Sequence, residues 1–231
     1  MEFAITINRI NDLKHWNTKY KRLYIGNEFC PRLLPGDYEL RKIIEFANNQ
    51  KLKISLMIGY TDCGSFNNVI GFLNSFTKGI ADEVIVNDWG VYQFVKENTK
   101  HKIVIGRVLS KFLAVHEKKT LDKLRISRLE FNDYKFAKTV NFPNIANSIY
   151  YPYLFIGATR YCPFVQISNN ISLNPGILNC TKECLNYKVM VLKNKDINED
   201  IYLKGNALFI KAESITCKNI NRIIYEPEIP I

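Results

Sequence analysis

Residues 83–106, EVIVNDWGVYQFVKENTKHKIVIG, contain the pattern that decides the fold. Two short apolar runs, EVIVN at 83–87 and KIVIG at 102–106, enclose the helical pattern WGVYQFVKEN. A run of this length that is apolar throughout is typical of a strand buried on both faces. A strand, a helix and a second strand in succession therefore predict two parallel strands joined by a crossover helix.

The same kind of run recurs along the chain, as FAITI (3–7), RLYIG (22–26), KISLMIG (53–59), SRLEF (127–131) and PYLFIG (152–157). Helical patterns lie between several of them, with Asp37 as a candidate cap before YELRKIIEFANNQ and Ser65 before NNVIGFLNSF. We therefore predict an α/β protein with a (β/α) TIM-barrel-like fold. The 231 residues fall short of the roughly 250 of a typical barrel, so an incomplete barrel and an open doubly wound sheet are the alternatives.

The pattern changes beyond Leu185, where YKVMVLKN, DIYLKG and ALFIKAES alternate like short strands. We expect a barrel-like domain over residues 1–185, including the cysteine loop, and a small C-terminal β extension over 186–231. No low-complexity linker separates the two parts, which predicts that the extension packs on the same unit.

Composition narrows the class of protein. The N-terminal stretch MEFAITINRINDLKHW lacks the features of a secretory signal, and no apolar run approaches the roughly 20 residues of a membrane span. We therefore expect a cytoplasmic protein, in which the six cysteines serve as ligands, nucleophiles or small core residues. The net charge of +10 favours phosphate-bearing partners, but the basic residues are spread along the chain, as on a generally solvated surface.

The most specific local feature is Cys180-Thr-Lys-Glu-Cys184, two thiols in one polar loop. A tetrahedral site needs two further ligands. Cys162 in ATRYCPF and Cys30 in NEFCPRLLPG each precede a proline and follow the end of a predicted strand, where barrel loops build sites. Four thiolates suit either an iron–sulfur cluster or zinc, and ligand softness alone does not separate the two.

The order of these segments resembles the U32 peptidase-like family, and most closely its short iron–sulfur barrel branch, which acts in oxygen-independent ubiquinone biosynthesis. The segments that carry the resemblance are RLYIGNEFC, EVIVNDWGVYQFV, KIVIGRVLSKF, ATRYCPF and CTKEC. The resemblance implies a [4Fe–4S] cluster held by Cys30, Cys162, Cys180 and Cys184, with zinc as the alternative metal.

The resemblance also implies a function in anaerobic redox chemistry. We expect an oxygen-independent hydroxylation, or a related redox modification, of a small aromatic or quinone precursor or of an RNA base. An electron donor and a second U32-family subunit are the implied partners. The alternative is a binding or scaffold subunit that iron–sulfur or zinc stabilises and that has no catalysis of its own.

Five other polar residues lie at or just past predicted strand ends, which is the catalytic face of a barrel. These candidate catalytic residues are Glu28, Asn87, Asp88, Arg107 and Glu130. Asp88 is equally well explained as the cap of the helix that follows it, and Arg107 is suited to hold an anion or to pair with a strand-end carboxylate. If the predicted strands are parallel neighbours, these side chains lie at one end of the sheet, close to Cys30.

The remaining candidates have plainer explanations. Cys63 and Cys217 are interpreted as small core residues. His116-Glu117 lacks the second histidine of a zinc-protease helix. The residues therefore give no support to peptidase activity.

Overall fold

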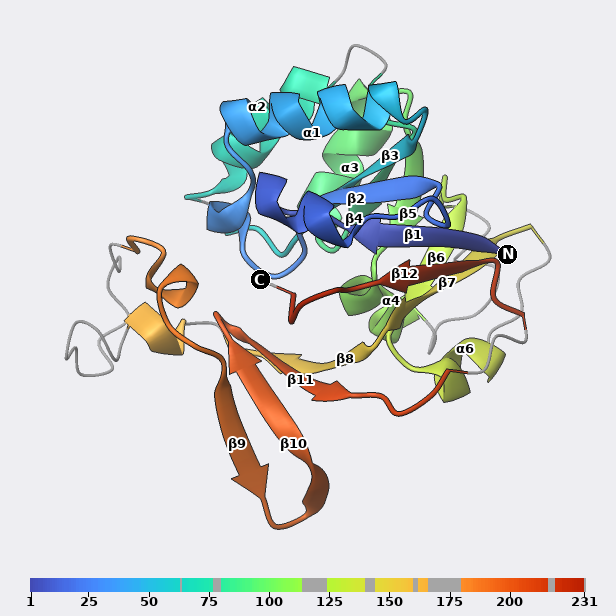
Figure 1. Ribbon diagram of the computed structural model, residues 1–231. Coiled ribbons are helices and arrows are strands. Elements are labelled where there is room, and N and C mark those ends of the chain that lie inside the picture. Colours follow the sequence, from blue (N-terminus) through green and yellow to red (C-terminus); the bar gives the residue numbers. More distant parts are fainter. Residues whose placement is uncertain are drawn as a thin grey trace.

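The computed structural model describes residues 1–62, 64–76, 80–113, 124–139, 144–159, 162–165, 180–215 and 219–230. Within these residues the parallel strands close a barrel in the order β1-β12-β7-β6-β5-β4-β3-β2, and four more strands form a separate antiparallel sheet (Figure 1). The predicted TIM-barrel-like fold is thus confirmed, and the barrel is closed.

The barrel strands are β1 (Glu2–Thr6), β2 (Arg22–Asn27), β3 (Lys53–Ile58), β4 (Glu83–Val86), β5 (Lys102–Ile105), β6 (Arg128–Phe131), β7 (Ala146–Tyr151) and β12 (Arg222–Tyr225). The helices are α1 (Asp37–Asn49), α2 (Phe66–Phe76), α3 (Trp89–Asn98), α4 (Arg107–Leu113) and α6 (Tyr134–Thr139). Short 3-10 turns are η1 (Ile10–His15), η2 (Pro31–Leu33) and η3 (Glu183–Leu185).

Apolar side chains fill both faces of the barrel strands. The outward-facing set packs under the helices, where α1 contributes Leu40, Ile43 and Ala47 from one face. The inward-facing set forms a layer across the barrel axis made of Ala4, Tyr24, Met57, Ile85, Val104, Tyr150 and Ile224. Burial on both faces explains why the strands are apolar runs instead of alternating ones.

Six of the predicted runs are barrel strands, but PYLFIG is not. It forms β8 (Tyr153–Ala158), which pairs antiparallel with β11 (Ala207–Lys211) in the second sheet. Phe155 is its one fully buried side chain, as expected of a strand covered on one face only. The barrel is completed by β7 and β12, which were not predicted. The polar Asn147 and Ser148 interrupt the apolar run of β7.

The second sheet has the strand order β8-β11-β10-β9, with β9 (Met190–Asn194) at the free edge and β10 (Ile197–Lys204) beside it. Figure 1 shows β8 and β11 running alongside the barrel, while β9 and β10 extend away from it. The chain enters this sheet before the predicted boundary at 185 and returns to the barrel with β12, between β1 and β7.

Two helix starts show how local chemistry fixes the elements. Asp88 caps α3, since its Oδ1 accepts hydrogen bonds from the backbone nitrogens of Gly90 at 2.8 Å and Val91 at 3.1 Å. Asp37 is not a cap, because α1 begins at Asp37 itself and Gly36 occupies the cap position. None of the helices in the described ranges combines the length and apolarity needed to cross a bilayer.

Candidate metal centre

The structure brings the four cysteines of the predicted metal site into one group at the carboxyl rim of the barrel. Cys30 follows β2 and Cys162 lies beyond the end of β8. Cys180 precedes η3 and Cys184 lies within it. All four are free thiols. The thiols lie near enough to raise one another's pKa electrostatically. The pKa of Cys184 is raised by each of the other three, that of Cys30 by Cys162 and Cys180, and that of Cys162 by Cys180.

Burial raises the pKa of three of the thiols, those of Cys30, Cys162 and Cys184. Burial, and after it the neighbouring thiols, raise the pKa of Cys184 to about 11. Burial is also the main reason why the pKa values of Cys30 and Cys162 lie above the ordinary value. Thiols with raised pKa values stay protonated at neutral pH, so they are poor nucleophiles, and a metal that binds them must displace the proton.

Backbone N–H groups nevertheless point at three of the sulfurs. Cys30 receives a hydrogen bond from the backbone of Arg32, and Cys162 receives them from Phe164 and Val165. The nitrogen of Lys182 donates to Cys180 Sγ at 3.4 Å. The donor lies two residues beyond Cys30 and two residues beyond Cys180. The two donors to Cys162 lie two and three residues beyond it. Such donors stabilise a negatively charged sulfur and tune a metal bound to it.

The loop that carries Cys30 is fixed by its own side chains and backbone. Asn27 Oδ1 accepts hydrogen bonds from the nitrogens of Phe29 at 3.0 Å and Cys30 at 2.8 Å. Gly26 has φ +126°, and a Cβ there would lie 2.1 Å from the carbonyl oxygen of Met57, so only glycine is accommodated. These contacts fix the backbone of the segment that carries Cys30.

The other side of the cysteine group is apolar. Cys184 is 4% exposed and packs in a cluster with Phe29, Phe155, Phe164 and Phe209, against which Cys162 also packs. The second sheet supplies most of this cluster, so the cysteines lie where the sheet meets the barrel. Within the described ranges, no three His, Cys, Asp or Glu side chains are arranged to hold a single metal ion.

Two of the candidate catalytic residues form an ion pair beneath this apolar cluster. Arg107 is fully buried, and its Nε donates to Glu28 Oε2 at 2.8 Å. Its terminal nitrogens bind Glu226, and its guanidinium stacks on the ring of Tyr150 at 3.8 Å. Burial raises the pKa of Glu28, and it raises that of Glu226 to about 8. Two buried carboxyls thus share one guanidinium, which disfavours full ionisation of both.

Glu130 lies inside β6, one step deeper along the barrel axis. Its two carboxyl oxygens accept hydrogen bonds from the hydroxyls of Tyr24 at 2.7 Å and Tyr150 at 2.6 Å. Burial raises the pKa of Glu130 to about 7. Because Tyr150 also stacks on Arg107, Glu130 is connected to the ion pair near the cysteines.

The other two candidates have structural contacts. Asn87 is buried, and its Oδ1 accepts from the nitrogen of Val108 at 3.0 Å while its Nδ2 donates to the carbonyl of Ile58 at 3.3 Å. It therefore joins the start of α4 to the end of β3. Asp88 caps α3, as one of its two interpretations predicted. A catalytic role for any of the five candidates stays a prediction.

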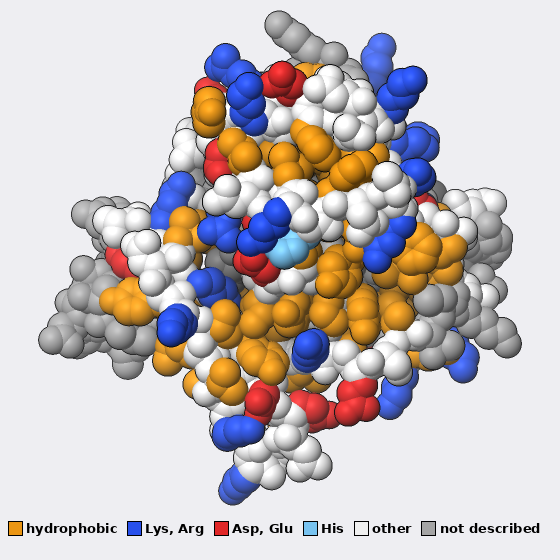
Figure 2. Space-filling model, in the orientation of Figure 1, with side chains coloured by type: hydrophobic (Ala, Val, Ile, Leu, Met, Phe, Trp, Pro, Cys, Tyr) orange, Lys and Arg blue, Asp and Glu red, His pale blue; other side chains and the backbone are white. Residues whose placement is uncertain are grey.

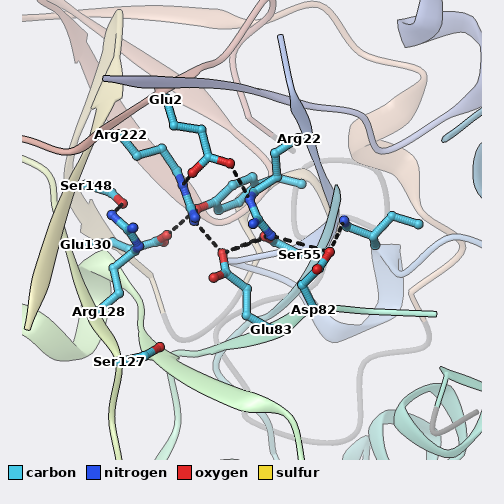
Figure 3. Close-up of polar contacts among 12 residues, drawn as sticks. Glu2, Arg22, Ser55, Asp82, Glu83, Ser127, Arg128, Glu130, Ser148 and Arg222 are labelled. Atoms are coloured by element: carbon cyan, nitrogen blue, oxygen red, sulfur yellow. Dashed lines mark hydrogen bonds and ion pairs between the residues drawn. The ribbon is translucent and has the colours of Figure 1, made fainter. Parts of the chain in front are cut away.

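A second polar layer at the amino end of the barrel was not predicted. Figure 3 shows Glu2, Arg22, Glu83 and Arg222 pointing toward one another across the barrel axis. Arg222 Nε donates to Glu2 Oε2 at 2.7 Å, Arg22 Nε donates to Glu2 Oε1 at 3.0 Å, and Arg222 also binds Glu83. Burial alone would raise the pKa of Glu83, but the two guanidiniums hold it below its usual range.

This layer connects to the rest of the interior, since Arg222 Nη1 donates to the hydroxyl of Tyr24 at 2.6 Å. Polar contacts thus follow the barrel axis from Arg222 through Tyr24, Glu130 and Tyr150 to Arg107. Alternate side chains along a barrel strand point inward. Polar residues at every second position, as in Arg222, Ile224 and Glu226, could therefore have indicated these interior contacts.

Fold and site together define a class of protein: a closed eight-stranded parallel α/β barrel of the TIM-barrel type, whose carboxyl rim carries four thiols beside a small antiparallel sheet. Among solved structures, that of the U32 peptidase Mk0906 is similar, with a TM-score of 0.58, coverage of 100% of this chain and 94% of that one, and 10% sequence identity. The likeness shows a shared fold. No protein-family profile and no curated protein sequence matches the chain.

Proposed function

We propose that this chain is a U32-type protein that binds a [4Fe–4S] cluster through Cys30, Cys162, Cys180 and Cys184 and takes part in redox chemistry. The observation that carries the proposal is the group of four mutually interacting free thiols, three of which receive backbone N–H hydrogen bonds. An all-thiolate donor set suits iron–sulfur chemistry, and N–H bonds to the sulfurs are one of the means by which proteins set a cluster's potential.

Four thiolates also suit a structural zinc ion, so this donor set is common to both metals. The choice of a cluster over zinc rests on the resemblance to U32 proteins in the segments that carry the four cysteines.

The cluster, when bound, would supply one-electron transfer to a substrate or partner. The resemblance to U32 proteins extends this proposal to an oxygen-independent hydroxylation, or a related modification, of a small aromatic or quinone precursor or of an RNA base. On the face shown in Figure 2 the Lys and Arg side chains are scattered and do not form one dense block. The net charge of +10 keeps an RNA base beside the small molecule as a substrate.

Peptide hydrolysis, which the name of the structural neighbour suggests, is not favoured by the residues. The two described histidines make other contacts, His15 with Glu228 and His101 with the carbonyl of Ala81. The raised pKa values of Cys30, Cys162 and Cys184 also make these thiols poor nucleophiles.

A scaffold role is the second candidate. The metal ligands come from positions 30, 162, 180 and 184, so a bound metal would tie the barrel to the segment that leads into the second sheet. The polar residues on the barrel axis are closed off from solvent, with Arg107 and Glu130 both 0% exposed. In this role a second U32-family subunit would carry the chemistry.

The cysteine assignment is tested by substitution in protein prepared without oxygen. Cys180→Ser and Cys184→Ser should each abolish the brown colour and the visible absorbance of the cluster. Cys63→Ala and Cys217→Ala are the matched controls and should retain both; these two residues lie outside the described ranges. Equal loss from all four variants would reject the assignment of ligands.

A further inference from the structure

The free edge of the second sheet is β9, which pairs with β10 on one side and with no strand of the described part of the chain on the other. An uncovered strand edge presents N–H and C=O groups to which a further strand can pair, and natural edges are often blocked by proline or by charged side chains. β9 contains no proline, and its one charged residue, Lys193, forms an ion pair with Asp200 of β10. The edge is therefore open to pairing.

Exposed apolar side chains gather beside this edge. Four of the ten exposed large hydrophobic side chains in the described ranges fall within the seven residues from 185 to 191, namely Leu185, Tyr187, Met190 and Val191. Scattered exposed hydrophobic residues are normal, whereas a concentration of them marks an interaction surface. The β9 edge thus offers both backbone pairing and apolar contact.

The shape of the molecule leaves room for a partner strand. Figure 1 shows the hairpin of β9 and β10 projecting from the barrel, with β9 outermost. A strand that pairs antiparallel with β9 runs in the opposite direction, so the body of a second copy would lie beyond the tip of the hairpin. Two copies can therefore meet at β9 without contact between their barrels.

The charge of the hairpin suits a second copy of this chain. The whole chain carries +10, which makes copies repel one another. Residues 188–200 are neutral, with three lysines and three acidic residues: Lys188, Lys193, Lys195, Asp196, Glu199 and Asp200. Lys188 and Asp196 form no ion pair with any residue in the described ranges.

These two charges select a register for antiparallel pairing of β9 with its own copy. If the two-fold axis passes at Leu192, Lys188 of each copy lies opposite Asp196, at the hairpin turn of the other. An axis at Val191 would place Lys188 opposite Asn194, and an axis at Lys193 would place two lysines opposite each other. Opposite charges across a strand pair stabilise it and like charges destabilise it, so the register about Leu192 is favoured.

We infer that two copies of this chain associate by antiparallel pairing of β9 with β9 about Leu192, which joins the two four-stranded sheets into one sheet of eight strands. The interface is isologous, so each copy covers the β9 edge of the other and the assembly closes as a dimer. This association goes beyond the proposed function and does not depend on a bound metal.

Sedimentation equilibrium of the full chain between about 1 and 200 µM, with reductant present so that free cysteines cannot link copies, tests the association. A pair of five-residue strands is small beside a standard interface, so the dimer should form in the micromolar range. Val191 is 53% exposed, and Val191→Lys would place a lysine opposite Lys193 of the other copy. This variant should raise the dissociation constant about tenfold or more, whereas Tyr60→Lys, at a residue 61% exposed beyond β3, should leave it unchanged.

Charge reversal tests the register. Lys188→Asp and Asp196→Lys should each raise the dissociation constant about tenfold, because each puts like charges together twice in the dimer, and the double variant should restore it. A chain that stays at 26.9 kDa throughout overturns the inference and leaves the β9 edge to a different partner. A dimer that Val191→Lys does not weaken, or single reversals that the double variant does not rescue, would overturn it as well.

Discussion

Glu130→Gln tests whether the buried carboxyl between Tyr24 and Tyr150 controls the stability of the barrel. Both tyrosine hydroxyls donate to Glu130, at 2.7 and 2.6 Å, and burial raises its pKa to about 7 from 4.5. Below pH 4.5 the group is protonated in both the folded and the unfolded chain. Between pH 4.5 and 7 the folded protein keeps a proton that the unfolded chain releases, so the free energy of unfolding falls as the pH rises. Above pH 7 the group is ionised in both states and the fall ends.

The size of the effect follows from the shift. A difference of 2.5 pH units, at about 1.36 kcal/mol each, gives about 3 kcal/mol of stability lost between acid and neutral pH. Glutamine cannot titrate, and its amide preserves a hydrogen bond with each tyrosine if one hydroxyl accepts instead of donating. The variant should therefore lack this part of the pH dependence and be stabilised relative to the native protein as the pH rises.

Urea unfolding of both proteins from pH 5 to pH 8 measures the difference directly. We expect the unfolding free energy of Glu130→Gln, less that of the native protein, to rise by about 2 to 3 kcal/mol over this range. Glu226 titrates in both proteins, but the charge of Glu130 is one of the causes that raise its pKa, so the subtraction reports the titration of Glu130 together with this coupling. Parallel stability curves would refute the reasoning, because they would mean that Glu130 is ionised in the folded protein throughout.

Three further outcomes follow from the contacts. Arg107→Met should destabilise the protein by about 3 to 5 kcal/mol in urea unfolding, since it leaves two carboxyls buried without their cation; a loss below 1 kcal/mol would contradict the ion pair. Asp88→Ala should cost about 1 kcal/mol in the same assay and leave metal content unchanged, whereas loss of metal would point to a role beyond the cap of α3. Metal removal should raise hydrogen exchange first in residues 163–187, while the strands from 3 to 131 stay protected. The reason is that metal bonding offsets the entropy of closing a long loop. Unchanged exchange in 163–187 would contradict this prediction.

The barrel could be predicted because its strands are buried on both faces, which makes them continuous apolar runs. The same reasoning assigned PYLFIG to the barrel, since an apolar run does not reveal which sheet it joins. It also missed β7, whose Asn147 and Ser148 break the run although the strand lies within the barrel. Strand order is set by pairing between residues far apart in the chain, as between Arg222 and Ser148, and no local pattern records it.

The cysteine group could be predicted because loop thiols are conspicuous and follow strand ends. The partners of the candidate catalytic residues could not. Glu226 binds an arginine 119 residues away, and Tyr24 binds a carboxyl 106 residues away. A single tyrosine or glutamate in an apolar strand is unremarkable in sequence, and only closure of the barrel shows which side chains meet on its axis.

Counts of iron, acid-labile sulfide and zinc per chain, in protein purified without oxygen, distinguish a cluster from a zinc ion. If Cys30, Cys162, Cys180 and Cys184 hold a [4Fe–4S] cluster, the native protein should contain about four irons and four sulfides, with zinc well below one equivalent. One zinc per chain without sulfide would contradict the account, because the four thiols would then hold a structural ion and not a redox centre.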